Sequence, residues 1–344
     1  MKRMSIVEAL REGIRAEMRR DERVFCIGED IAIPGGWGGA FTVTLGLEKD
    51  FPDRMLNTPI AEAASFGVAC GAAMMGMHPI ADVQYSDFLM CAFDQVANNI
   101  AKLRYMSGGK LKMPLTMRAP VGVTGRGSQH AQNMETFFMP LPGIKLVCPA
   151  TAYDALGLLR SAVRCEDPVM IFEHKLLYGS KGARQESGTV DASSEIPDED
   201  YTVPFGKGIV RREGRDVTVI AALLMMHRSL QAAGALAKEG ISVEVIDPRS
   251  LVPFDWNIVR TSLAKTGRVV IVEESPKRGG IGAEMGATIA EDMAGLLRAP
   301  IKRVAAPNTP APFSPPMEKF YVPQVERIIE GIRETMKYGK GHHG

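Results

Sequence analysis

The sequence lacks the features that mark several protein classes. Its 344 residues include five cysteines, an odd number without a C-x-x-C pair, which argues against a disulfide framework or a zinc site. The balance of Lys and Arg over Asp and Glu is 41 − 40 = +1, so the charge points neither to nucleic acid nor to an anionic membrane surface. No run of about 18 apolar residues occurs that could span a membrane. The N-terminal residues differ from a secretion signal, because acids interrupt their apolar positions, and we expect a cytoplasmic protein.

Several catalytic signatures are also missing. The chain has no Walker loop, no H-E-x-x-H and no G-x-S-x-G. The segment "GGIGAEMG" (279–286) is similar to a dinucleotide fingerprint, but its spacing differs and the loop before the helix is long. We interpret it as a helix start whose glycines allow close packing.

What is present is an alternation of strands and helices. Short apolar segments at 24–28, 79–84, 114–119, 144–149 and 168–173 predict strands, and amphipathic segments after Ser5 and at 87–106 and 152–164 predict helices. This pattern predicts α/β architecture with a mostly parallel sheet. From about 179 to 204 the chain is polar and lacks periodicity, and then the alternation resumes. We therefore expect one domain over 1–180, a linker over 181–204 and a second domain over 205–344.

The stretch "NTPIAEAASFGVACGAAMMGM" (57–77) is an unusual helix. Thr58 is suited to cap it, with Pro59 at its first position and Glu62 in its first turn. A carboxylate there complements the helix dipole, which is the ordinary explanation. The small residues that follow leave every face free of bulk, as at a tight subunit or domain contact. Desolvation at such a contact would raise the pKa of Glu62, whereas the helix dipole would lower it. The sequence therefore leaves open whether Glu62 has a structural or a chemical role.

A second candidate residue lies in a glycine-rich loop. His130 belongs to "PVGVTGRGSQHAQNME" (120–135), directly after a predicted strand. Sites in α/β proteins gather at strand ends, so a histidine in such a loop is more often functional than one on a helix, and a plain surface histidine stays the alternative. The remaining histidines are expected to be structural (His78, His174, His227) or solvated (His342, His343).

Taken in order, longer motifs connect these features. They include "GED" (28–30), "NTPIAEAA" (57–64), "FDQVANNIAKLRYMSGG" (93–109), "QHAQNME" (129–135), "FEHKLLY" (172–178), "VEVIDPRSLVP" (243–253) and "RGGIGAEM" (278–285). Over nearly its whole length the chain resembles the beta subunits of thiamine-diphosphate-dependent 2-oxo-acid dehydrogenases, the first component of pyruvate, branched-chain and acetoin dehydrogenase complexes. "EHKLLY" and "VIDPRSLVP" are most similar to the acetoin and bacterial pyruvate types.

The resemblance implies a fold and a site. The fold is two three-layer α/β/α domains, a transketolase-like pyrimidine-binding domain followed by a transketolase C-terminal domain. Glu62 falls on the catalytic glutamate of the family, which hydrogen-bonds a pyrimidine nitrogen of thiamine diphosphate and so promotes ionisation of the thiazolium carbon. Phe88 falls where an aromatic ring packs on the pyrimidine, with Ile60 beside it. His130 falls on the active-site histidine, which orients substrate or assists acyl transfer to a lipoyl group. Cys91 lies near the cofactor where many relatives carry another residue, so it is a candidate for setting substrate choice.

Metal ions and partners also follow from the resemblance. Some members bind a structural potassium ion, and the matching positions here are Leu115, Ala162, Val163, Cys165 and Asp167, with Cys165 in place of a usual Asp. Thiamine enzymes hold the diphosphate through Mg²⁺ bound by a G-D-G motif, which this chain lacks. A separate alpha subunit is therefore expected to hold Mg²⁺ and to share thiamine diphosphate in an α2β2 assembly. A lipoylated dihydrolipoyl acyltransferase would accept the acyl group.

Three alternatives stay open at the level of sequence. The first alternative is a branched-chain 2-oxo-acid dehydrogenase beta subunit. The second is half of a split transketolase that acts on sugars, and the third is a non-catalytic scaffold subunit. The retained Glu62, Phe88 and His130 argue against the scaffold, and the dehydrogenase-type C-terminal segment argues against the transketolase.

Overall fold

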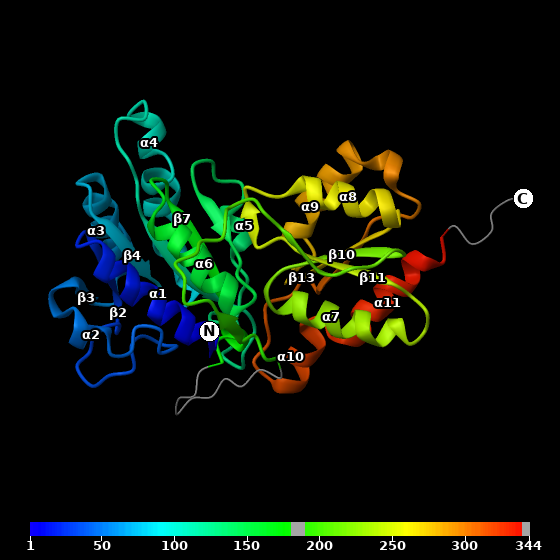
Figure 1. The fold of residues 1–344 in the computed structure, drawn as a ribbon, viewed down its shortest axis with the longest axis horizontal. Helices are drawn as coiled ribbons and strands as arrows, with labels where there is room; N and C mark the ends of the chain where they lie inside the picture. Colours follow the sequence, from blue (N-terminus) through cyan, green and yellow to red (C-terminus); the bar gives the residue numbers. More distant parts are fainter. Residues whose placement is uncertain (180–189, 339–344) are drawn as a thin grey trace, which may run out of the picture.

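The computed structural model describes residues 1–179 and 190–338, which form two large sheets side by side, each covered by helices on both faces, and one small two-stranded sheet (Figure 1). We call the larger sheet with its helices the first unit and the smaller one the second unit. The larger sheet has the strand order β12-β6-β7-β5-β4-β2-β3. Its strands are β2 (Val24–Glu29), β3 (Met55–Thr58), β4 (His78–Asp82), β5 (Thr116–Val121), β6 (Lys145–Val147), β7 (Val169–His174) and β12 (Ser250–Val252). All pairings in it are parallel except that between β12 and β6.

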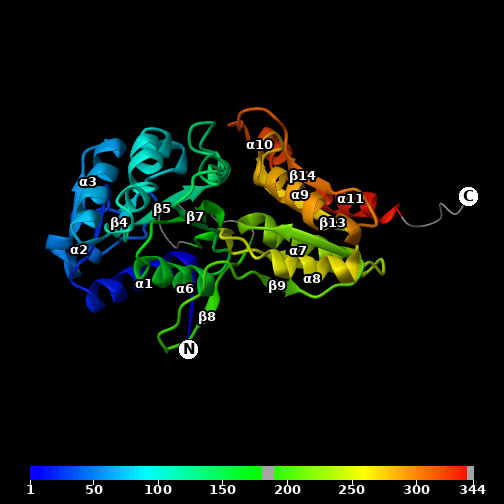
Figure 2. The same ribbon diagram turned by 90° about the horizontal axis from the view of Figure 1, so that it is seen from above.

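The helices of the first unit lie on opposite faces of this sheet. On one face α1 packs on α6, and on the other α3 packs on β4 and against η3. The helical segments are α1 (Ile6–Arg20), α2 (Leu47–Asp50), η1 (Pro52–Arg54), α3 (Glu62–Met74), η2 (Ser86–Met90), η3 (Gln95–Ile100), α4 (Leu103–Met106), α5 (Glu135–Phe138), α6 (Ala152–Val163) and η4 (Lys175–Leu177). Seen from above, α3 lies at the end of the molecule away from the second unit (Figure 2).

The second unit has the strand order β14-β13-β10-β11-β9, with only β9 antiparallel. Its strands are β9 (Ile209–Arg212), β10 (Val217–Ala221), β11 (Val243–Asp247), β13 (Val269–Pro276) and β14 (Lys302–Ala306). Its helical segments are α7 (Leu223–Ala237), α8 (Trp256–Thr266), α9 (Ile281–Asp292), η5 (Ala294–Leu296), α10 (Pro315–Tyr321) and α11 (Val325–Met336). The predicted α/β architecture with mostly parallel sheets is confirmed.

Local sequence rules account for several elements. Helix α1 begins with a capping box in which the Ser5 side chain accepts from the Glu8 amide and Glu8 accepts from the Ser5 amide. Its apolar stripe is buried against α6. At α9, a Cβ on Gly280 would lie 2.2 Å from the Glu273 carboxylate, and one on Gly282 would lie 2.7 Å from it. Two of the four glycines of "GGIGAEMG", Gly280 and Gly282, therefore serve close packing, as predicted, whereas Gly279 has no neighbour within 4 Å.

One prediction of secondary structure was wrong. The single helix expected over 87–106 is divided into the 3-10 helix η2, the π-helix η3 and α4. Side chains of Asn98 and Asn99 bond to residues one turn earlier, and the Ala101 amide reaches back to the Val96 carbonyl, so the chain keeps its buried face with a wider turn. The predicted linker contains β8 (Ser194–Ile196), which pairs with β1 (Lys2–Met4). Residues 180–189 of that linker lie outside the described residues.

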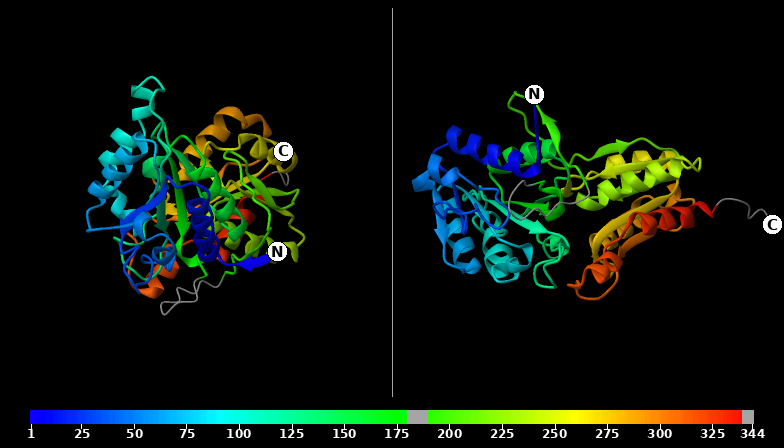
Figure 3. Two further views of the ribbon diagram at one scale, coloured as in Figure 1. Left: turned by 60° about the vertical axis from the view of Figure 1, so that its left-hand side comes forward. Right: turned by 90° about the horizontal axis from the view of Figure 1, so that it is seen from below.

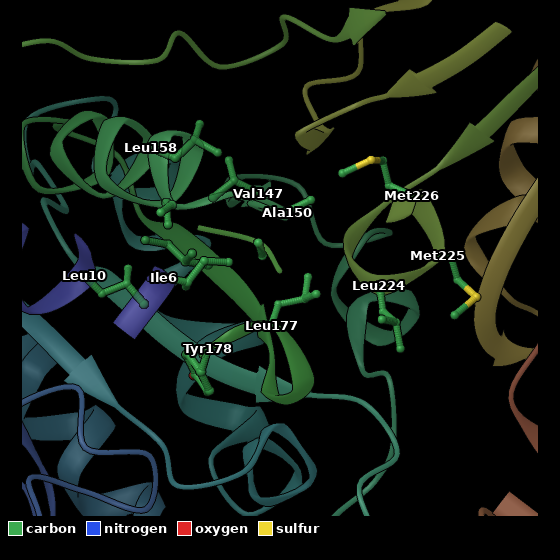
Figure 4. Packing of buried hydrophobic residues seen from close by; sticks show 14 of the residues in the cluster. Ile6, Leu10, Val147, Ala150, Leu158, Leu177, Tyr178, Leu224, Met225 and Met226 are labelled. Carbon is green, nitrogen blue, oxygen red and sulfur yellow. The ribbon is translucent and has the colours of Figure 1, made fainter. Parts of the chain in front are cut away.

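The hydrophobic core is continuous across the two units. One cluster of buried residues joins Leu10 of α1 and Leu158 of α6 to Leu224 and Met226 of α7 (Figure 4). Strand β12, which follows the second unit's β11 in sequence, completes the first unit's sheet by pairing with β6. The predicted boundaries at 180 and 205 would assign β12 to the second domain, although it pairs with a strand of the first unit. These boundaries stay a prediction. Within the described ranges, no helix is long and apolar enough to cross a membrane.

Candidate active site

The predicted site residues follow the carboxyl ends of neighbouring parallel strands. Registers of β3 on β2, β2 on β4 and β4 on β5 align these ends along one edge of the larger sheet. Glu62 comes four residues after the end of β3, Phe88 six residues after β4, and His130 nine residues after β5. Open α/β sheets bind their ligands at this edge.

Helix α3 begins at Glu62 itself, not at Pro59 as predicted. Thr58 is the last residue of β3, because a residue that precedes proline is restricted to extended conformations. Ala61 takes the N-cap position without a side-chain cap, and its amide donates to the Glu29 carboxylate at 3.2 Å. The Thr58 hydroxyl is buried and has no hydrogen-bond partner among the described residues. The prediction that Thr58 caps the helix was therefore wrong, but the Glu62 carboxylate does lie in the first turn, half-buried.

Glu29 is a second carboxylate beside Glu62 that the sequence did not single out. It ends β2 and is 6% exposed. Burial, and then the neighbouring charge of Glu62, raise the pKa of Glu29 to about 7, against the lowering effect of the Ala61 amide. A carboxyl group that titrates near neutral pH thus lies next to the predicted catalytic glutamate. Its signal in the sequence was its position at the end of a buried strand.

Phe88 and His130 meet in a small aromatic cluster. The ring centroids of Phe88 and His130 are 5.2 Å apart, with the planes at 80°. Tyr85 lies edge-on to both rings, 4.7 Å from His130 and 5.7 Å from Phe88. Edge-to-face contacts at these distances are favourable and fix the ring orientations. The structure therefore brings together two residues that the sequence placed 42 positions apart.

The buried Lys175 supports this cluster from the end of β7. Its ammonium group donates to the His130 carbonyl and lies 5.0 Å from the centre of the Tyr85 ring. The side chain is fully buried. Lys175 was not predicted as a site residue, although its place after a parallel strand gave the same signal as that of His130.

Ile60 and Cys91 lie at the surface of this chain. The Ile60 side chain is 82% exposed, and Cys91, at the end of η2, is exposed as a free thiol. The Cys91 amide donates to the Phe88 carbonyl at 2.9 Å, which ties it to the aromatic cluster. An exposed apolar residue next to the start of α3 is one that a bound ligand or a partner chain can cover.

The outer face of α3 is made of small and apolar residues. Ser65, Phe66, Ala69, Cys70 and Ala73 face the sheet and are buried. The opposite face carries Ala64, Gly71 and the exposed Val68 and Met75, and both Val68 (55%) and Met75 (85%) are accessible. An apolar helix face of this kind in a single chain is typical of a protein–protein contact.

Most of the predicted potassium ligands already have partners within this chain. The carbonyls of Leu115 and Ala162 accept from the amides of Val169 and Cys165, and the Val163 carbonyl is 3.2 Å from the His78 ring. The Asp167 carboxylate pairs with Arg104 and with Lys145. In the described part of the chain, no group of three or more His, Cys, Asp or Glu side chains is arranged to hold a metal ion. A potassium ion at this place would use the second lone pair of each carbonyl, and the site stays a prediction.

Comparison with protein families covers most of the chain. Residues 2–181 match the transketolase pyrimidine-binding domain, and residues 206–328 match the transketolase C-terminal domain. The chain belongs to the transketolase-like family. Among solved structures, this family member superposes on a split-gene transketolase described as an inactive β4 tetramer, with a TM-score of 0.78 and 24% identity over 98% of this chain and 99% of that one. A likeness at that identity shows the fold.

Curated relatives in the family are similar over their full length. The chain is 43% identical to the beta subunit of acetoin:2,6-dichlorophenolindophenol oxidoreductase from Cupriavidus necator, covering 98% of this chain and 99% of the relative. It is 43% identical to the 2-oxoisovalerate dehydrogenase subunit beta of Bacillus subtilis, over 97% and 99%. It is 39% identical to the pyruvate dehydrogenase E1 component subunit beta of the same organism, over 98% and 100%. The resemblance predicted from the motifs is confirmed.

Proposed function

We propose that this chain is the beta subunit of a thiamine-diphosphate-dependent dehydrogenase that acts on a 2-oxo acid or on acetoin together with an alpha subunit. The observation that carries the proposal is the placement of Glu62 at the start of α3, on the same sheet edge as the contact between Phe88 and His130. The relatives that bear such names share 39% to 43% of their residues with it over nearly the whole chain.

The residues at this edge fit the pyrimidine half of the cofactor. A pyrimidine is a flat ring with polar edges, so it needs an apolar surface for its face and hydrogen-bonding groups for its nitrogens. Phe88 offers a half-buried aromatic ring, and Glu62 offers a carboxylate. Two buried oxygens lie close in sequence to these residues: Thr58 Oγ1 shortly before Glu62, and Asp87 Oδ2 directly before Phe88. Within the described residues, neither oxygen has a hydrogen-bond partner. Unpartnered polar atoms of this kind are expected beside a ligand-binding surface.

Each side chain then has a defined task. When bound, thiamine diphosphate supplies an electron sink for cleavage next to a carbonyl. Glu62 would hydrogen-bond a ring nitrogen of the cofactor, and Glu29, with a pKa of about 7, holds or releases a proton beside Glu62 at neutral pH. Phe88 and Ile60 would cover the ring and exclude water. His130 orients the substrate or assists transfer of the acyl group, and Cys91 contributes to substrate choice.

The proposal requires a partner chain. The sequence has no G-D-G motif, so we assign Mg²⁺ and the diphosphate to an alpha subunit in an α2β2 assembly. The outer face of α3 is the surface that such a subunit would cover. A lipoylated dihydrolipoyl acyltransferase would be the acyl acceptor, and the complex would be cytoplasmic.

The first candidate for the substrate is acetoin or a pyruvate-type 2-oxo acid. Relatives named for acetoin and for 2-oxoisovalerate are both 43% identical to this chain. A branched-chain 2-oxo acid is therefore the second candidate. Pocket residues on the alpha subunit contribute to this choice as well.

Reconstitution tests the proposal. The chain is co-expressed with a candidate alpha subunit, and reduction of 2,6-dichlorophenolindophenol is followed with pyruvate, 2-oxoisovalerate or acetoin. We expect activity that depends on thiamine diphosphate, on Mg²⁺ and on both chains. A complex that assembles and binds the cofactor yet turns over none of the three would favour a scaffold subunit or a sugar-specific transketolase, which a ketose-phosphate assay would separate.

We also propose that potassium binds at Leu115, Ala162, Val163, Cys165 and Asp167. The family resemblance supports this, although Asp167 is engaged by two cationic side chains. The melting temperature of the complex should be higher in potassium chloride than in sodium chloride of equal concentration. Equal melting temperatures in the two salts would refute the site.

A further inference from the structure

The loop that carries His130 is held by the second unit. Residues 122–130 leave β5 of the first unit and run beside the segment that leads into α10 of the second unit (Figure 3). The Val123 amide donates to Glu274 at 2.7 Å, and the Gly125 amide donates to Glu318 at 2.8 Å. The Ser128 hydroxyl donates to the Ala311 carbonyl. Three successive parts of the loop thus bond to residues more than 150 positions later in the chain.

The Glu274 contact is buried and has a defined proton arrangement. Its other carboxylate oxygen lies 2.8 Å from His174 Nε2, and His174 Nδ1 accepts from the Leu176 amide at 3.2 Å. Because an amide can only donate, Nδ1 is the acceptor and Nε2 carries the hydrogen that Glu274 receives. Glu274 and His174 are 4% and 2% exposed. Glu274 therefore fixes the base of the loop to the end of β7 and to β13 at once.

Two glycines of the loop, Gly122 and Gly127, have positive φ and lie close to neighbouring side chains. Gly122 has φ +101, and a Cβ there would lie 2.2 Å from His174 Nε2. Gly127 has φ +79, and a Cβ there would lie 3.3 Å from the Phe313 ring. Neither conformation suits other residues. Gly122 lets the base of the loop lie against His174 of the first unit, and Gly127 lets its middle lie against Phe313 of the second unit.

We propose that Glu274 and Glu318 are positioning residues that set the place of the His130 ring from the second unit. At its far end the loop is fixed by the Lys175 bond to the His130 carbonyl, and the ring is held against Tyr85 and Phe88. The proposal rests on the role assigned to His130 in the proposed function. It adds that packing between the two units, and not the first unit alone, determines where that ring lies. Displacing a group by about 1 Å at a reacting centre can cost about 100-fold in rate.

Glu318 is the better site for a test, because it is partly exposed on a short helix and its replacement leaves the core intact. Glu318→Ala removes the acceptor for the Gly125 amide, and Glu318→Gln keeps an acceptor while it removes the charge. In the assembled complex we expect Glu318→Ala to lower kcat about tenfold and Glu318→Gln to stay within about twofold of the wild type. In a His130→Ala background, Glu318→Ala should cause no further loss beyond about twofold. An equal loss in both backgrounds, or no loss in either, would overturn the proposal.

A readout without catalysis separates this proposal from the proposed function. Trypsin cleavage after Arg126 reports on the order of the loop in the same complex. It should be faster in Glu318→Ala and in Glu274→Gln than in the wild type, and unchanged in Glu318→Gln. An unchanged rate in Glu318→Ala shows that the second unit does not hold the loop, whatever the enzyme acts on. Full activity of His130→Ala, with the cleavage rates as expected, would instead refute the assigned role of His130, and with it the positioning role that depends on it.

Discussion

At the scale of single residues, the pair Glu29 and Glu62 is the chemical centre of the account. The two carboxyl groups end up together because β2 and β3 are parallel neighbours with Glu29 opposite Thr58. Burial and the second charge raise the pKa of Glu29 to about 7, so one proton is available beside Glu62 near neutral pH. This pairing depends on strand register, which the sequence alone does not reveal.

The raised pKa of Glu29 should be visible in how the stability of the protein depends on pH. The pKa of Glu29 is raised on folding, so its stabilising effect is complete below its unfolded value and is lost as pH rises through about 7. The melting temperature of the wild type should therefore fall relative to that of Glu29→Gln between about pH 5 and about pH 8, and the difference should level off above this range. Parallel melting curves for the two proteins across this range would contradict the assignment.

A second prediction for single residues concerns the buried ionic cluster of Arg118, Glu173 and Asp82. Arg118 is 1% exposed and makes two hydrogen bonds to Glu173, at 2.9 and 2.6 Å, as well as one to Asp82. Burial raises the pKa of Asp82 to about 6 even beside this cation. Arg118→Leu leaves buried carboxylates unpaired and should lower the free energy of unfolding by about 3–5 kcal/mol.

The control for this variant is Arg23→Leu. Arg23 pairs with Asp21 at the surface, where an ion pair contributes about 1 kcal/mol or less. Both variants are compared with the wild type by urea unfolding of the chain. If Arg118→Leu were no more destabilising than Arg23→Leu, the cluster would have no structural role.

At the scale of elements, α3 shows what sequence patterns can and cannot establish. The small-residue composition predicted a helix that another chain approaches, and the structure leaves Val68 and Met75 of its outer face exposed. The start of the helix was predicted three residues too early, because Thr58 and Pro59 match a capping pattern and the extended restriction before proline was overlooked. The strand-end rule predicted His130 at the edge of the sheet, and the family resemblance added Phe88. Both follow strands that end at one edge, but three of the bonds that hold the His130 loop come from the second unit. Such long-range contacts leave no local pattern.

The outer face of α3 should be required for assembly. Val68→Arg places a charge in the proposed contact, where it would be desolvated without a partner, so we expect the α2β2 complex to dissociate or fail to form. Gln231→Arg, on the exposed side of α7, is the matched control and should assemble normally. The sedimentation coefficient of each variant, mixed with the alpha subunit, shows whether the α2β2 complex forms. Normal assembly of Val68→Arg would place the subunit contact elsewhere.

At the scale of the whole molecule, the two units form one body around a continuous core. Buried residues from α1, α6 and α7 belong to one cluster, and β12 completes the first unit's sheet. The mainly parallel architecture was predictable from alternation, but β1, β3, β8, β9, β12 and β14 were missed. Each of them has five residues or fewer, so a period of two is hard to recognise in them.

The most direct test of the central claim is the activity of Glu62→Gln in the assembled complex. The account predicts that this variant assembles with the alpha subunit and retains thiamine diphosphate, but loses activity by about 100-fold or more, because glutamine cannot exchange a proton with the ring nitrogen. Glu22→Gln, at an exposed residue in the turn after α1, serves as the control and should be fully active. Full activity of Glu62→Gln in a complex that depends on thiamine diphosphate would contradict the account.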